Sequence, residues 1–291
     1  MDALFEPLSF QFFQRALVAS VLAGVVCAII GSYVVLKGLA FIGDALAHAT
    51  FPGVVAAFIF GGPYVIGGGI AAFLAAISIG WISRRAHLRV DTAIGVVFAG
   101  TFALGILMYS AIQGFVGELL GFLVGNVLAI GADDLAGLLV IGAIVMVIVA
   151  ALWKELLYAT FDPLGAAASG LPVGALEYLF LGLVALTIVL SLQAVGIILV
   201  VAMLVTPAAT AQLLTVRFAR LIVLATLIGA TTAVVGLYLS YWLDVASGAT
   251  IVLVQTSVFL VALLLSPRSG LLRRPRAAPS NHLEGSSGAG P

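Results

Sequence analysis

Long runs of apolar residues, separated by short polar stretches, dominate the chain. Nine runs approach or exceed the roughly 20 residues that a helix needs to cross a bilayer. They cover residues 15–36, 40–61, 65–83, 91–112, 135–152, 174–193, 195–215, 219–243 and 249–266. Five glycines interrupt the segment 113–134, which we expect to be an outer loop with short helical or re-entrant turns. The pattern predicts an all-α polytopic membrane protein with eight to nine transmembrane helices.

Composition agrees with this fold class. Hydrophobic residues make up 63% of the 291 residues and charged residues 8%, and the mean hydropathy is +1.29, which excludes an ordinary soluble domain. The chain divides into an interfacial segment at 1–14, a transmembrane domain at 15–266 and a tail at 267–291, first basic and then of disordered composition. A single cysteine, Cys27, excludes an intramolecular disulfide framework.

Basic residues predict the orientation. If the chain crosses the membrane at each predicted span, eleven of the twelve lie in or beside loops on the same side. These are Lys37, Arg84, Arg85, Arg89, Lys154, Arg217, Arg220, Arg268, Arg273, Arg274 and Arg276. Only Arg15 falls at the other side. Because basic residues concentrate in cytoplasmic loops, we expect the C-terminus in the cytoplasm and, with nine spans, the N-terminus outside.

One apolar segment contains a carboxylate and an imidazole four residues apart, Asp44 and His48. At helical spacing the two side chains share a face. Ionisable residues within a membrane are costly and usually mark an ion pathway or a proton relay. The alternative is a structural pair that only forms hydrogen bonds with neighbouring helices.

Two further stretches have recognisable local chemistry. In the loop 153–173, Asp162 and Pro163 are typical of a helix start, and Gly170 of a helix end. We expect a short helix there. It either fits a groove on a soluble partner or is an ordinary connector. In the run 195–211, Pro207 is expected to kink a helix, and Thr206 and Thr210 either satisfy the freed carbonyl groups or line a path.

Four stretches then carry a family resemblance. Gly-Asp-Ala-Leu-Ala-His-Ala at 43–49, Asp-Thr-Ala-Ile-Gly at 91–95, the Asp-Pro loop ending at Gly170 and the 195–211 run occur in this order. Together they resemble the membrane permeases of bacterial ABC importers for manganese, zinc and iron(II), over about 15–266. The resemblance implies about eight spans and a bacterial inner (plasma) membrane location.

The resemblance also implies partners and site residues. The partners would be a second copy of the chain, a dimer of cytoplasmic ATPases and an extracytoplasmic metal-binding protein. Asp44 and His48 would be metal ligands. The element that couples to the ATPase would contain Asp162, Pro163, Gly165 and Gly170. The pathway would include Thr50, Pro52, Thr206, Pro207 and Thr210.

The residues limit the chemistry further. His48 is the only histidine expected in the membrane, so one chain cannot build a nitrogen- or sulfur-rich zinc cage, and manganese is favoured over zinc or iron(II) as the transported ion. No phosphate-binding G-x-x-x-x-G-K-[ST] run is present, so ATP hydrolysis is expected in a partner chain.

The alternatives to an ABC permease are a secondary transporter or channel and an intramembrane enzyme. An ATPase-independent secondary transporter or channel would need more acidic or histidine-bearing spans. An intramembrane enzyme would need a nucleophile or an HExxH-type helix beside Asp44 and His48, and none accompanies them. We therefore expect a transport subunit and not an enzyme, with no nucleic-acid partner and no bound cofactor beyond the transported metal.

Overall fold

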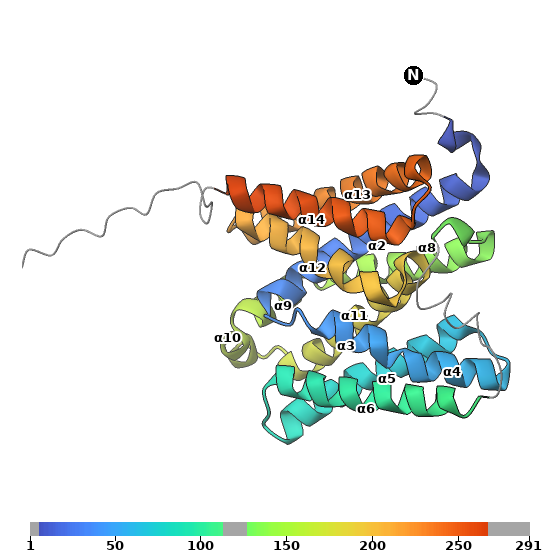
Figure 1. Cartoon of the computed structure of the whole chain (residues 1–291). Coiled ribbons are helices and arrows are strands. Elements are labelled where there is room, and N and C mark those ends of the chain that lie inside the picture. The colour runs from blue at the N-terminus through green and yellow to red at the C-terminus, as the bar shows by residue number, and fades with distance from the viewer. Residues whose placement is uncertain (1–5, 113–126, 267–291) are drawn as a thin grey trace, which may run out of the picture.

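A computed structural model describes residues 6–112 and 127–266 (Figure 1). Residues 1–5 of the expected interfacial segment, most of the expected outer loop and the whole tail at 267–291 lie outside the described residues. Within the described part all regular structure is helical, as the apolar pattern predicts. The α-helices are α2 (Gln11–Leu36), α3 (Ile42–Ala49), α4 (Phe51–Phe60), α5 (Tyr64–Arg85), α6 (Val90–Ser110), α8 (Ala132–Ala151), α9 (Trp153–Phe161), α10 (Pro163–Ala168), α11 (Val173–Val195), α12 (Ile197–Leu214), α13 (Phe218–Leu243) and α14 (Ser247–Leu265). Short 3-10 turns lie at Pro7–Ser9 and Val127–Ala129.

Eight helical segments are long and apolar enough to cross a membrane, which confirms a polytopic fold. Eight of the nine expected runs correspond to them. The remaining run, 195–215, forms α12, which contains a shorter apolar stretch, Val200–Leu214. The sharp break at Gly196, whose φ is +83°, separates α12 from α11.

The helices form two groups joined by a central element. In Figure 1, α12, α13 and α14 lie together with α2 in the upper part, and α3, α4, α5 and α6 in the lower part. The helix α11 packs against α2 of the first group and α5 of the second, and α12 packs against α3. The helix that carries Asp44 and His48 therefore lies where the two groups meet.

Close helix crossings depend on glycine. Gly24 of α2 lies against Gly229 of α13, and a Cβ on Gly24 would lie 2.7 Å from the Gly229 carbonyl oxygen. A Cβ on Gly53 of α4 would overlap the carbonyl oxygen of Gly67 on α5. Small residues permit such backbone approach, which is a main source of helix association in lipid.

Basic side chains gather at one end of the bundle, which we call the basic end. It contains α9, α10, the α5–α6 connection, the α12–α13 connection and the last turn of α14, all on the left in Figure 1. There the Ser266 hydroxyl donates a hydrogen bond to the Leu213 carbonyl oxygen at 2.9 Å. Arg15 lies in the first turns of α2, near the opposite end. The distribution agrees with the predicted topology, and the assignment of the basic end to the cytoplasm stays a prediction.

Candidate metal pathway and coupling element

Asp44 and His48 meet on one face of α3, as their spacing predicts. Nδ1 of His48 lies 3.3 Å from Oδ1 of Asp44 and 3.0 Å from the main-chain oxygen of Asp44. A neutral imidazole that donates its Nδ1 proton to Asp44 leaves the Nε2 lone pair free to bind a cation. The Asp44 side chain is 42% exposed and that of His48 25%, so both remain accessible from outside the chain.

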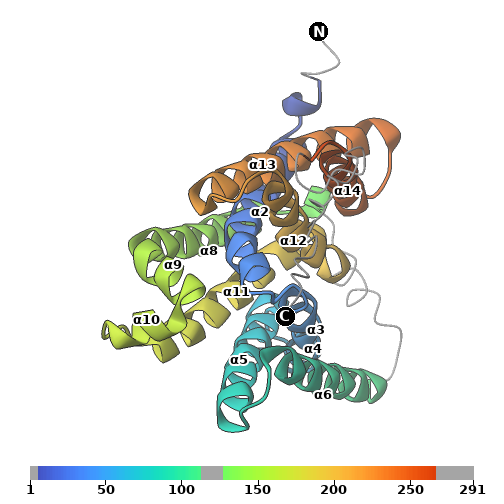
Figure 2. The ribbon, with the colours of Figure 1, turned by 90° about the vertical axis from the view of Figure 1, so that its left-hand side faces the viewer.

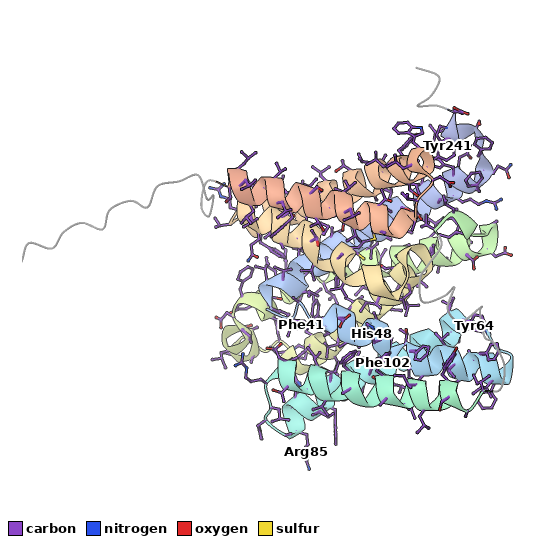
Figure 3. All side chains as sticks on the ribbon, in the orientation of Figure 1. Phe41, His48, Tyr64, Arg85, Phe102 and Tyr241 are labelled. Carbon is purple, nitrogen blue, oxygen red and sulfur yellow. The ribbon has the colours of Figure 1, made fainter. Side chains whose placement is uncertain are left out.

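Two aromatic rings of α6 hold the imidazole. The His48 ring makes edge contacts with Phe98 and Phe102, at centroid distances of 5.4 and 5.2 Å. The two phenyl rings are stacked on each other at 6.0 Å. Figure 3 places His48 and Phe102 near the middle of the bundle's length. Phe98 and Phe102 were not predicted as site residues, although two aromatic residues four positions apart on an apolar helix share a face and were a usable signal.

The break between α3 and α4 was also not predicted, because the 40–61 run was treated as one span. The chain has an interruption at Thr50, two residues before Pro52. Proline has no N–H, so Pro52 cannot donate to the carbonyl oxygen of His48 four residues earlier. This oxygen is a main-chain acceptor next to the two candidate ligands.

The expected pathway residues Thr50 and Pro52 are buried. The Thr50 hydroxyl donates to the Ala47 carbonyl oxygen at 2.6 Å. The Pro52 ring packs on α6, where a Cβ on Gly105 would lie 3.1 Å from Pro52 Cδ. These contacts give the two residues a role in packing α3 and α4 against α6, and leave the accessible polar face to Asp44 and His48.

On α12, Pro207 and Thr210 are buried and Thr206 is half-buried. The Thr210 hydroxyl donates to the Thr206 carbonyl oxygen at 2.7 Å, whereas Pro207 frees the carbonyl of Met203. Thr210 therefore bonds a different carbonyl from the one that Pro207 leaves without its helical donor. The same helix reaches α3 through Leu204, whose Cδ2 would lie 3.0 Å from a Cβ on Gly43.

One chain supplies only part of a metal shell. Within residues 6–112 and 127–266 no three His, Cys, Asp or Glu side chains cluster as metal ligands do. Two ligands suit transient binding, and the remaining ligands must come from water, main-chain oxygens or another chain.

The expected coupling element is a capped helix at the basic end. Oδ1 of Asp162 accepts a hydrogen bond from the Gly165 N–H at 2.8 Å, Pro163 occupies the first position of α10, and Gly170 ends the turn at φ +87°. Leu164 is 84% exposed. In Figure 2, which views the molecule from the basic end, α9 and α10 lie at the edge of the molecule, beside α8 and α11.

A small cavity of about 120 Å³ lies beneath this element. Lys37 and Glu177 line it together with Thr160 and Pro163. Burial lowers the pKa of the Lys37 ammonium, and the charge of Glu177 opposes that effect. Glu177 also accepts hydrogen bonds from Nε and Nη2 of Arg84, at 3.2 and 2.6 Å. One carboxylate thus connects the end of α2, just before α3, to the end of α5 and the start of α11.

Comparison with known proteins gives consistent matches over nearly the whole chain. The sequence model of the ABC 3 transport family matches residues 9–266. The manganese transport system membrane protein MntC of Halalkalibacterium halodurans is 44% identical over 92% of both chains. The chelated iron transport system membrane protein YfeD of Yersinia pestis is 39% identical over 95% of this chain and 96% of its own. Among solved structures, PsaBC from Streptococcus pneumoniae, in complex with Fab, is similar with a TM-score of 0.81 and 36% identity, over 92% of this chain and 96% of the other.

Proposed function

The chain belongs to the ABC 3 transport family, and from that premise we propose that it is the membrane permease subunit of an importer of divalent transition metal ions. The observation that carries the proposal is the Asp44–His48 pair, accessible and held by Phe98 and Phe102. A cation in a low-dielectric path needs negative charge and lone pairs, which one carboxylate and one neutral imidazole supply.

Manganese is the ion that this site favours. Relatives are named for manganese and for iron transport, which is consistent with a site that divalent cations share. Carboxylate and main-chain oxygens with a single imidazole suit manganese better than zinc, which prefers a shell richer in nitrogen or sulfur. Iron(II) and zinc are the alternatives, and elemental analysis of the metal retained by the purified complex distinguishes them.

The partners follow from the same premise. A second copy of the chain would complete the permease, a pair of cytoplasmic ATPases would supply energy, and an extracytoplasmic metal-binding protein would deliver the ion. The exposed Leu164 on the capped helix α10 supports docking to an ATPase, because an apolar side chain outside the membrane is stabilised when a partner buries it. Basic loops beside α10 support a cytoplasmic position for this end and for the C-terminus.

Metal uptake with a defined ATPase tests the proposal. Proteoliposomes containing the permease and its ATPase should accumulate radioactive manganese only with ATP, and an ATPase without its phosphate-binding lysine should abolish uptake. Equal uptake with that inactive ATPase would identify an ATPase-independent transporter instead.

A further inference from the structure

An apolar groove of about 490 Å³ lies on the outside of the bundle, away from Asp44 and His48. Its floor is α11, and its walls are α5 and α8, each of which packs against α11 (Figure 2). The lining includes Phe73 and Ile77 of α5, Ile148 of α8, and Tyr178, Gly182 and Leu186 of α11. A Cβ on Gly182 would lie 3.1 Å from Cε2 of Phe73. Because Gly182 has no side chain, the groove stays open beside that ring.

The end of the groove nearest the basic end is polar. The guanidinium of Arg84 lies over the Tyr178 ring, 5.4 Å from its centroid, and the Arg84 side chain is 42% exposed. Arg85 in the last turn of α5 and Lys154 in the first turn of α9 are also exposed. The acidic groups near this end are Glu177 of α11, paired with Arg84, and Glu155 of α9, whereas Asp133 and Asp134 lie in the first turn of α8, at its other end. Three basic side chains therefore accompany two acidic ones.

The distance along α5 from the groove residue Phe73 to Arg84 matches the thickness of one leaflet. Phe73, Ile77 and Arg84 share a face of α5, and the 11 residues from Phe73 to Arg84 rise about 16 Å at 1.5 Å per residue. Half of a hydrocarbon core of about 30 Å is about 15 Å. With Arg84 and Tyr178 at the level of the headgroups, Phe73 lies near the middle of the bilayer, where an acyl chain ends.

We propose that this groove is a binding site for a phospholipid of the leaflet at the basic end. One acyl chain lies on α11 between α5 and α8, and the phosphate contacts Arg84 and the Tyr178 hydroxyl. An anionic headgroup is preferred to a zwitterionic one, because Arg85 and Lys154 add positive charge that Glu177 and Glu155 do not balance. Since α9 follows α8 directly, the bound headgroup lies beside the proposed coupling element.

The charge at the polar end selects this occupant over a second copy of the chain. A helix from another copy would fill the groove with side chains and add no anionic partner for Arg84 beyond Glu177, which is its ion-pair partner within the described residues. A phosphate instead adds a charge-assisted hydrogen bond to a guanidinium that is already oriented by the Tyr178 ring.

Native mass spectrometry of the purified permease tests the proposal without metal or ATPase, so its outcome is independent of the transport assignment. Protein in nanodiscs of equal parts phosphatidylglycerol and phosphatidylcholine is released and the retained lipids are counted. The parent should retain one phosphatidylglycerol per chain, in severalfold excess over phosphatidylcholine. Gly182→Leu should lose it by filling the groove, and Arg84→Gln should lose the headgroup preference.

Gly100→Leu is the matched control, because a Cβ on Gly100 of α6 meets no atom within 4 Å. It should retain lipid as the parent does. Equal retention of the two lipids by the parent, or undiminished phosphatidylglycerol on Gly182→Leu, would overturn the proposal. Loss of a permease dimer in Gly182→Leu with no change in lipid count would assign the groove to a second copy.

Discussion

Leu204 of α12 lies against Gly31 of α2 so closely that a Cβ on Gly31 would overlap the Leu204 carbonyl oxygen. The side chain of the same leucine faces Gly43, the residue before Asp44, at the start of α3. Leu204 therefore connects the main chain of α2 to the helix that carries the candidate metal ligands. A side chain on Gly31 would require α2 and α12 to move apart, whereas a side chain on Gly43 would require only the end of the Leu204 side chain to shift.

Gly31→Ala should destabilise the protein by about 1–3 kcal/mol, because the added methyl group forces α2 and α12 apart. The thermal unfolding midpoint of the detergent-purified protein measures the effect. Gly100→Ala is the control, since its methyl group points into open space, and it should unfold at or slightly above the parent's temperature because alanine favours a helix more than glycine does. Equal midpoints for the two variants would show that the crossing tolerates expansion.

The pKa of Lys37 predicts a change of stability with pH. Because burial lowers this pKa, the folded state loses the Lys37 proton at a lower pH than the unfolded state does. Between the two pKa values the unfolded state binds more protons, so stability rises with pH. Unfolding midpoints of the parent and Lys37→Met, measured at rising pH up to 10.5, the ordinary pKa of lysine, should converge or cross as the parent gains stability. A constant difference across this range would contradict the assignment.

Leu164→Asp should separate the permease from its ATPase. The side chain is 84% exposed on α10, so the substitution costs the folded permease little, whereas a charge in an apolar interface is strongly unfavourable. The measurement is co-purification of the ATPase with a tagged permease. Ser169→Ala, at the other end of α10, is the control and should retain the partner. Normal co-purification with Leu164→Asp would remove α10 from the interface.

Local patterns predicted much of this protein. Apolar runs located the helices, the spacing of Asp44 and His48 put both side chains on one face, and Asp162 caps α10 as expected. These features depend on near neighbours in the chain. The contacts of His48 with Phe98 and Phe102 and the Arg84–Glu177 ion pair join residues 50 or more positions apart, so only the folded chain reveals them.

The break at Thr50 was missed for a different reason. The family resemblance placed Pro52 on the expected pathway, but hydropathy alone treats 40–61 as one uninterrupted run. The missing N–H of Pro52 interrupts the hydrogen-bond pattern one turn after His48. The effect of a proline on main-chain acceptors is local chemistry, and counting freed carbonyl groups would have found it.

Metal uptake by Asp44→Asn tests the central claim most directly. The substitution keeps the shape and hydrogen-bonding capacity of the side chain and removes the charge that a cation needs in a low-dielectric path. His48→Gln is its partner variant, retaining polarity while losing the imidazole nitrogen. Asp244→Asn is the control. Asp244 ends α13, at the end of the bundle opposite the basic end, in a left-handed conformation that asparagine also adopts readily.

All three variants should reach the membrane and assemble with the ATPase in parent amounts. We expect ATP-driven manganese uptake to fall about tenfold or more in Asp44→Asn and His48→Gln, and to stay at the parent rate in Asp244→Asn. Parent-like uptake by a normally assembled Asp44→Asn would mean that Asp44 and His48 only support the fold, which would contradict the account.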